Sequence, residues 1–196
     1  MSGFRELIDN AIDEQDFERT EELLDVFEYW DPGFLRALLY RRVSHAFRER
    51  VYMLMVPKID VNHRFENGNT LLHLAAAHGM IRAVSMLLRA GADADVYDGL
   101  HRTPLMSACL AVARDPDGAG AASGNTKAIC LHLALASANL HATDVWGLTA
   151  RDYAARLGET GDRCIFYILA AVVRRRTNPY KRTYAELTAS SFVPLA

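Results

Sequence analysis

The residues of this chain that could bind a metal or act as nucleophiles are its histidines and cysteines, and their spacing suits neither chemistry. The sequence has seven histidines and three cysteines. His73 and His78 are five residues apart and Cys130 and His132 are two apart, so along a helix neither pair converges on one ion. No Cys-x-x-Cys or His-Glu-x-x-His motif is present. We therefore expect no metal site and no cofactor.

The sequence also lacks the motifs of common catalytic centres. It contains no Gly-x-Ser-x-Gly nucleophile motif and no Gly-x-x-x-x-Gly-Lys phosphate loop, and Gly118-Ala119-Gly120 does not follow a predicted strand. Many carboxylates lie between residues 6 and 31, but a solvated helical face accounts for them without a general acid and base. We predict that the protein is not an enzyme and has no small-molecule substrate.

The composition is that of an ordinary soluble domain. Of its 196 residues, 51% are hydrophobic and 23% are charged. The three cysteines, at positions 109, 130 and 164, are odd in number and far apart, which favours buried thiols in a reducing compartment. The N-terminus has no apolar signal-peptide segment, and the longest apolar run, 164–173, is too short to span a membrane. We expect a cytoplasmic location, with the nucleus as the alternative, and no membrane partner.

Charge is distributed unevenly along the chain. Residues 1–31 contain eleven acids and two bases, whereas residues 32–58 contain six bases and one acid. If the first helices are neighbours, the two segments partly neutralise each other; the alternative is that both are solvated faces. The formal net charge of the whole chain is −2, so we do not expect the molecule as a whole to bind nucleic acid.

Hydrophobic spacing predicts a chain built from helices. The segment between residues 114 and 126 is rich in Gly, Ala and Pro, which predicts an inserted flexible loop at 115–125. The predicted helices cover residues 3–14, 16–29, 34–40, 46–55, 70–77, 81–89, 103–114, 126–136, 150–156 and 161–173.

The segment from Thr70 to Asp93 is the clearest supersecondary unit of the sequence, with two short predicted helices separated by Gly79. Thr103-Pro104-Leu105 begins the same pattern 33 residues after Thr70, and Thr149 begins it again 46 residues after Thr103. A period of this size is typical of stacked helix pairs, which usually bind other proteins.

Residues 66–97 and 103–105 resemble the ankyrin repeat, and the resemblance extends weakly to 149–158 and 59–62. It implies an all-α fold, a short ankyrin-like solenoid of stacked helix-turn-helix repeats with an irregular acidic helical cap at its N-terminus. We expect this cap at 1–32, repeats at 33–65, 66–98, 99–143 and 144–173, the loop 115–125 inserted in the third repeat, and a basic and polar tail at 174–196. Terminal repeats of such stacks are often atypical.

Several repeat residues have predicted structural roles. Thr70 and Thr103 are placed to cap the first helix of their units. Pro104 falls in a first helical turn, where no backbone N–H is needed. Gly79 and Gly91 suit helix C-termini with positive φ.

The resemblance also gives His73 a structural role. It implies that the imidazole hydrogen-bonds to the backbone within the turn, rather than acting in catalysis. The sequence departs from the family pattern at Leu71, which replaces the usual proline, and at Met106, which replaces the histidine of the next repeat.

The resemblance implies that a partner protein binds to the turns between repeats and to the concave face beside them. The turns 63–69, 96–102 and 143–148 are rich in large side chains, and Tyr, Trp and Arg often contribute most to interface energy. The alternative for Phe65 and Leu100 is that they fold under the turns as part of the core. The predicted partner-binding residues are Arg64, Phe65, Tyr97, Leu100, His101, Arg102, Val145 and Trp146.

A second candidate site is the basic segment 174–182. Its five bases are Arg174, Arg175, Arg176, Lys181 and Arg182, and it contains no acid. It could serve nuclear import or contact a nucleic acid, although arginines at a helix C-terminus also suit the helix dipole. We predict a non-catalytic adaptor or inhibitor that binds a partner protein. The alternative is a nuclear, transcription-linked regulator that uses the basic segment.

Overall fold

The computed structural model describes residues 2–26, 30–113, 121–136 and 138–156, and in these ranges the chain forms helices and turns without a strand. This confirms the all-α fold class. Predicted helix 161–173 and the basic tail lie outside the described residues. The helices are α1 (Ser2–Asp13), α2 (Phe17–Leu24), α3 (Pro32–Leu38), α4 (His45–Met55), the 3-10 helix η1 (Val56–Lys58), α5 (Leu71–Ala77), α6 (Ile81–Arg89), α7 (Pro104–Ala113), α8 (Ala121–Leu135) and α9 (Ala150–Ala155).

The early helices begin where short polar side chains satisfy free backbone N–H groups. Asp16 accepts the N–H of Arg19 before α2, and Ser44 accepts that of Phe47 before α4. Asp31 caps α3, and Pro32 follows it as the first helical residue, where its missing N–H costs nothing. The helix predicted at 34–40 therefore begins two residues earlier.

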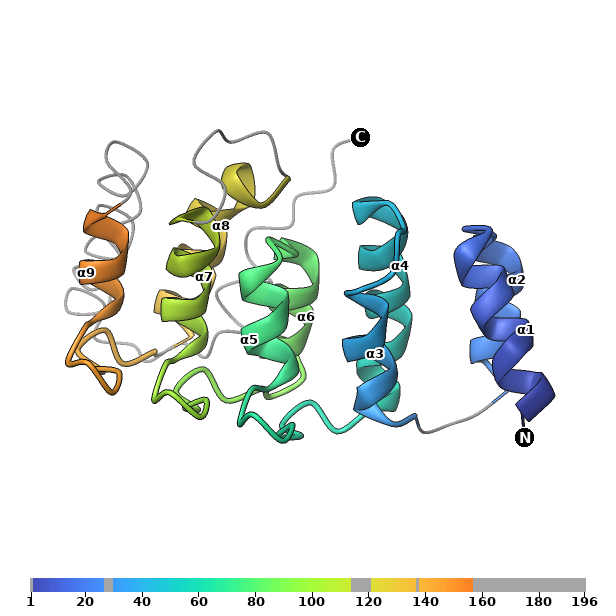
Figure 1. Ribbon diagram of the computed structural model, residues 1–196, viewed down its shortest axis with the longest axis horizontal. Helices are drawn as coiled ribbons and strands as arrows, with labels where there is room; N and C mark the ends of the chain where they lie inside the picture. The colour runs from blue at the N-terminus through green and yellow to red at the C-terminus, as the bar shows by residue number, and fades with distance from the viewer. Residues whose placement is uncertain (1, 27–29, 114–120, 137, 157–196) are drawn as a thin grey trace.

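The helices stack in two rows (Figure 1). One row is α3, α5, α7 and α9, and the other is α2, α4, α6 and α8, with each helix packed on its neighbours in the row. Helix α1 packs against α2 at the N-terminal end. A continuous hydrophobic core runs between the rows, and it includes the buried side chains of Cys109 and Cys130.

Three of the structural roles predicted from the sequence are confirmed by helix ends. Thr70 is the N-cap residue of α5, and the hydroxyl of Thr103 accepts the N–H of Met106 at 3.4 Å. Pro104 is the first residue of α7. The two glycines at helix C-termini, Gly79 and Gly91, have φ of 70° and 89°.

The segments that precede α5, α7 and α9 share one backbone turn, which we call the tip turns (residues 65–69, 98–102 and 144–148). In each, the first N–H donates to the carbonyl of the fifth residue at 2.9 to 3.0 Å. Neighbouring tip turns are also joined, since Gly99 N–H donates to the Asn67 carbonyl at 2.9 Å and Val145 N–H to the Leu100 carbonyl at 3.2 Å. The tip turns therefore form a hydrogen-bonded row along one edge of the stack (Figure 1).

The fourth residue of each tip turn has a left-handed backbone. Gly68, His101 and Gly147 have φ of 76°, 57° and 74°. Gly68 also needs the absence of a side chain, because a Cβ there would lie 2.7 Å from the Gly99 nitrogen. His101 is the one non-glycine residue of the three, so the middle tip turn carries backbone strain that the other two avoid.

Replacing His101 with glycine is expected to raise the free energy of unfolding by about 0.5 kcal/mol. Relief of the left-handed strain exceeds the extra entropy that glycine adds to the unfolded chain. The reciprocal change, Gly147→His, should lower it by about 1 kcal/mol, because a Cβ at Gly147 meets no atom within 4 Å and the φ penalty is the main cost. Urea unfolding of both variants measures this; equal destabilisation by both would contradict it.

The N-terminal cap packs on the stack through opposite charges. Arg41 pairs with Asp9 at 2.6 Å and with Asp13 at 2.8 Å, and Lys58 pairs with Asp25 at 2.5 Å. The acidic segment 1–31 and the basic segment 32–58 therefore partly neutralise each other, as expected if their helices were neighbours.

The prediction of a loop over residues 115–125 is wrong for residues 121–125. Helix α8 begins at Ala121, so residues 121–125 are helical. Ala121 and Ala122 are the strongest helix formers, and they outweigh Gly124 and Asn125 in the same turn and a half. Residues 114–120 lie outside the described ranges.

Candidate functional site

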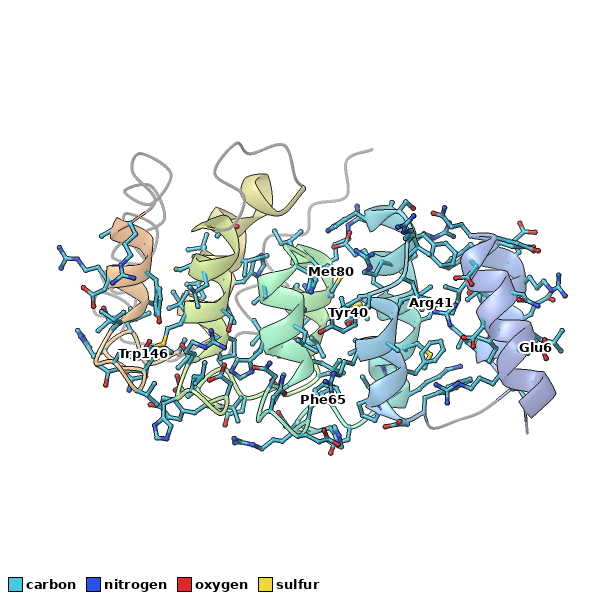
Figure 2. The ribbon with its side chains drawn as sticks, in the orientation of Figure 1. Glu6, Tyr40, Arg41, Phe65, Met80 and Trp146 are labelled. Carbon is cyan, nitrogen blue, oxygen red and sulfur yellow. The ribbon has the colours of Figure 1, made fainter. Side chains whose placement is uncertain are left out.

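Three predicted partner-binding residues form an exposed apolar patch on the tip turns. The exposed fractions are 39% for Leu100, 53% for Val145 and 62% for Trp146. The backbone bond between Val145 and Leu100 holds the two tip turns side by side, and Trp146 follows Val145 in the chain. We call these three residues the tip patch; Trp146 is labelled on the turn below α9 in Figure 2.

The prediction that Phe65 contacts a partner is wrong. Its side chain is 7% exposed and belongs to the core, where the Arg36 guanidinium lies 5.2 Å from its ring centroid and the His63 ring packs edge-on at 5.1 Å. Phe65 is the first residue of its tip turn, and this position points inward in the other tip turns as well. The alternative, that Phe65 folds under the turn, is confirmed, whereas Leu100 remains exposed.

The other predicted site residues are partly used by the turns themselves. Arg64 is exposed, and its guanidinium donates to the Tyr97 carbonyl at 2.6 Å. Tyr97 is half-buried, with its ring 5.7 Å from that of exposed His101. Arg102 forms an ion pair with Asp98 at 2.7 Å, so its charge is neutralised within the turn. That these four residues contact a partner stays a prediction.

Two buried aspartates were not predicted from the sequence. Asp98 and Asp144 begin the second and third tip turns, at the position of Phe65 in the first. Each carboxylate accepts two backbone N–H groups of its own turn, at 2.8 Å in one and 2.9 Å in the other. An aspartate five residues before the threonine cap, in two of three units, was the signal that could have identified them.

Hydrogen bonds hold both carboxylates in the ionised form. Burial raises the pKa of each, but bonds from Arg102 to Asp98, and from the Tyr153 hydroxyl and the backbone of Leu148 and Trp146 to Asp144, outweigh it and leave each pKa below its usual value. Burial and the bond to Asp144 raise the pKa of Tyr153 to about 12. These groups are therefore fixed in one protonation state near neutral pH, as structural groups are.

His73 is a structural histidine that joins two repeats. Its Nδ1 accepts the N–H of Thr70 at 3.1 Å, and its Nε2 lies 3.0 Å from the carbonyl of Arg102 in the next tip turn. These partners assign the proton to Nε2. Burial lowers the pKa of His73, so the imidazole is neutral at pH 7. This agrees with the backbone-bonding role implied by the resemblance.

The described residues contain neither a candidate metal site nor a candidate membrane span. Within these ranges, no group of three or more His, Cys, Asp and Glu side chains is placed to hold a metal ion. Across the same part of the chain, no helix is both long enough and apolar enough to cross a bilayer. The basic residues 174–182 lie outside it.

Comparison with known proteins places this geometry in a family. A family model described as ankyrin repeats (3 copies) matches residues 39–115. The tyrosine-protein kinase HTK16 of Hydra vulgaris is 44% identical over 55 residues, which are 28% of this chain and 7% of that protein. The putative ankyrin repeat protein FPV219 of Fowlpox virus (strain NVSL) is 34% identical over 71 residues, 36% of this chain and 16% of that protein.

The matched segments thus cover only a small part of the length of either relative. The kinase activity belongs to the Hydra protein. The matched family segment contains α4 to α7, two of the tip turns and the His73 bonds. Ankyrin repeats generally mediate protein–protein interaction and are typically non-catalytic. Residues 39–115 of this chain therefore match the ankyrin-repeat family.

Proposed function

We propose that this protein is a non-catalytic adaptor or inhibitor that binds a partner protein through its tip patch. The tip patch is formed by Leu100, Val145 and Trp146, and the partner contributes an apolar side chain that fills the space beside the indole. The observation that carries the proposal is the exposure of Trp146, a large aromatic side chain that is more than half accessible to solvent.

The surroundings of the tip patch support a protein partner. Exposed tryptophan is unfavourable in water, and tryptophan is among the residues that contribute most to protein interfaces. The row of hydrogen-bonded tip turns holds the patch rigidly, so little side-chain or loop entropy is lost on binding. The charge of Arg102 beside it is neutralised by Asp98, which leaves an apolar contact surface with few charges to desolvate.

The double variant Leu100→Ser, Trp146→Ser is expected to weaken partner binding by about 30-fold or more. Partners captured by the full chain from a cell extract would be identified by mass spectrometry and expressed, and their dissociation constants measured with the purified chain. Helical circular dichroism should not change, because both side chains are exposed.

Met53→Ser is the matched control. Met53 is a similarly exposed apolar residue, but it lies on α4, away from the tip turns. A partner that binds the tip-patch double variant as tightly as the wild type, or that loses as much affinity with Met53→Ser, would refute binding at the tip patch. The nuclear alternative would depend on the basic residues 174–182, which lie outside the described ranges.

A further inference from the structure

The turn between α3 and α4 carries an exposed serine that follows two arginines. Residues 41–44 read Arg-Arg-Val-Ser, and Ser44 lies outside both helices as the N-cap of α4. Basophilic serine kinases select arginines two and three residues before the acceptor, because acidic groups of the kinase pair with the guanidinium ions of an extended substrate segment. The sequence of 41–44 meets this requirement, and the segment lies between the two helices, with Ser44 itself in an extended backbone conformation.

We propose that Ser44 is a phosphorylation site for a basophilic serine kinase, and that the phosphate releases the N-terminal cap, α1 and α2, from the first helix pair of the stack. In the reaction the Ser44 Oγ bonds to the γ-phosphorus of ATP. The bond from that phosphorus to the β–γ bridging oxygen breaks, the hydroxyl proton passes to a carboxylate of the kinase, and ADP leaves.

The site is open to a kinase in the folded chain. Ser44 and Arg42 are exposed, and residues 41–44 form no regular secondary structure. Arg41, three residues before the acceptor, is held by Asp9 and Asp13 of α1 and faces the cap (Figure 2). Partly exposed ion pairs contribute little to stability, so a kinase carboxylate can replace these partners. Binding of Arg41 by the kinase itself then loosens the cap.

The phosphate is compatible with α4. The Ser44 hydroxyl accepts the N–H of Phe47 at 3.3 Å, and phosphate oxygens are stronger acceptors at a helix N-terminus, where negative charge is favoured. Arg48 already donates to the carbonyls of Leu38, Arg41 and Val43, so it holds the turn in place independently of the serine. The first helix pair of the stack therefore survives the modification.

The cap, in contrast, faces the phosphate with acidic groups. The Ser44 N–H donates to the Gln15 side chain at 2.9 Å, and Gln15 lies between exposed Glu14 and Asp16. A phosphoserine adds a charge of about −1.5 to −2 at pH 7. This charge repels those carboxylates and competes with Asp9 and Asp13 for Arg41. Each of these effects weakens the polar contacts that hold the cap against the turn before α4.

A second serine in the described part of the chain shows why exposure matters. Ser85 also has an arginine three residues before it, Arg82, but it is half-buried in the middle of α6. A kinase cannot extend this segment without unfolding the helix. Ser85 therefore serves as an internal control for the folded state.

The first experiment treats the full chain with ATP and the purified catalytic subunit of cyclic-AMP-dependent protein kinase. All variants carry Thr177→Val, because Thr177 follows Arg174–Arg176 and would also accept a phosphate. We expect one phosphoryl group on Ser44 and none on Ser85 by mass spectrometry. Ser44→Asn, which keeps an N-cap side chain, should abolish incorporation, and Arg42→Gln should slow it by about 10-fold. No incorporation into the Thr177→Val chain, or incorporation that persists when Ser44→Asn is added, would overturn the site.

The second experiment compares amide hydrogen exchange before and after phosphorylation. Amides of α1 and α2 should exchange about 10-fold faster in the phosphorylated chain, whereas those of α5, α6 and α7 should not change. Unchanged exchange in α1 and α2 would overturn cap release, and so would faster exchange throughout the stack.

Discussion

Alanine in place of His73 is expected to lower the free energy of unfolding by about 3 kcal/mol. The change removes the acceptor of the Thr70 N–H and the donor to the Arg102 carbonyl, and it leaves both backbone groups without these partners in a buried region. It also opens a cavity beneath a tip turn. Urea unfolding followed by circular dichroism measures the loss. A value below about 1 kcal/mol would mean that the imidazole bonds contribute little net stability.

The pH dependence of the free energy of unfolding of the His73 variant distinguishes the hydrogen-bonding contribution of the imidazole from its packing contribution. Burial lowers the pKa of His73, His78 and His132 below the unfolded value of 6.5. Their contribution to stability is therefore complete above pH 6.5 and is lost as the pH falls through the folded-state pKa values, by at most about 1.4 kcal/mol per pH unit for each group. Replacing His73 should reduce the slope of stability against pH just below pH 6.5, with His73→Gln as a milder companion variant.

The second large effect is expected for Asp144→Ala, about 2 to 3 kcal/mol. The carboxylate is buried, and it accepts the N–H groups of Trp146 and Leu148 and the Tyr153 hydroxyl. Alanine leaves three hydrogen-bond donors without their acceptor. It also removes the side-chain bonds that hold the turn bearing Trp146. Partner affinity should therefore fall together with stability, unlike the effect of Trp146→Ser, which should reduce affinity alone.

Asp144→Asn is the matched variant for this prediction. The amide keeps one acceptor oxygen for the turn, so it should lose about half as much stability as alanine. The lowered pKa of Asp144 means that its contribution is present at neutral pH and disappears only as the pH falls through that value, below the range in which the histidines act. Equal losses for asparagine and alanine would show that negative charge, rather than acceptor geometry, stabilises the turn.

Much of the architecture was predictable because the repeat signals are local. Thr70, Thr103 and Thr149 mark three first helices, and the 3/4 hydrophobic spacing marks the helices themselves. Two boundaries are misplaced by five residues. Helix α2 ends at Leu24 rather than at 29, and α8 begins at Ala121 rather than at 126, because two alanines begin a helix within a segment of loop-like composition. The amino-acid composition of a segment gives one average prediction for all of its residues. A helix, in contrast, starts at the residue where its first turn becomes stable.

The candidate site was less predictable, because exposure depends on the register of each turn. Phe65 and Trp146 both lie in tip turns, yet Phe65 is the first residue and Trp146 is the third. Counting back from the threonine caps would have placed Phe65 with Asp98 and Asp144, all buried, and Trp146 with exposed Leu100. Residue type alone suggested that both aromatic rings were exposed.

Contacts between distant segments could not be read from the sequence. The bonds from Arg41 to Asp9 and Asp13, and from Ser44 to Gln15, depend on how the cap helices pack on the stack. The charge pattern predicted that these regions could neutralise each other, but no local pattern selects the partner of a given arginine. The strain at His101 is similarly hidden until its position is compared with Gly68 and Gly147.

The bond from His73 to the next tip turn has no counterpart one repeat later, where Met106 offers no donor. The junction between α7 and the turn before α9 is held by the Val145 to Leu100 bond and by apolar packing. In a linear array, cooperative unfolding divides at weakly held junctions, and this junction lacks the histidine bond that the one before it has. The tip patch spans this junction, so a partner bound to Leu100 and Trp146 together would clamp it and make the two sides unfold as one unit.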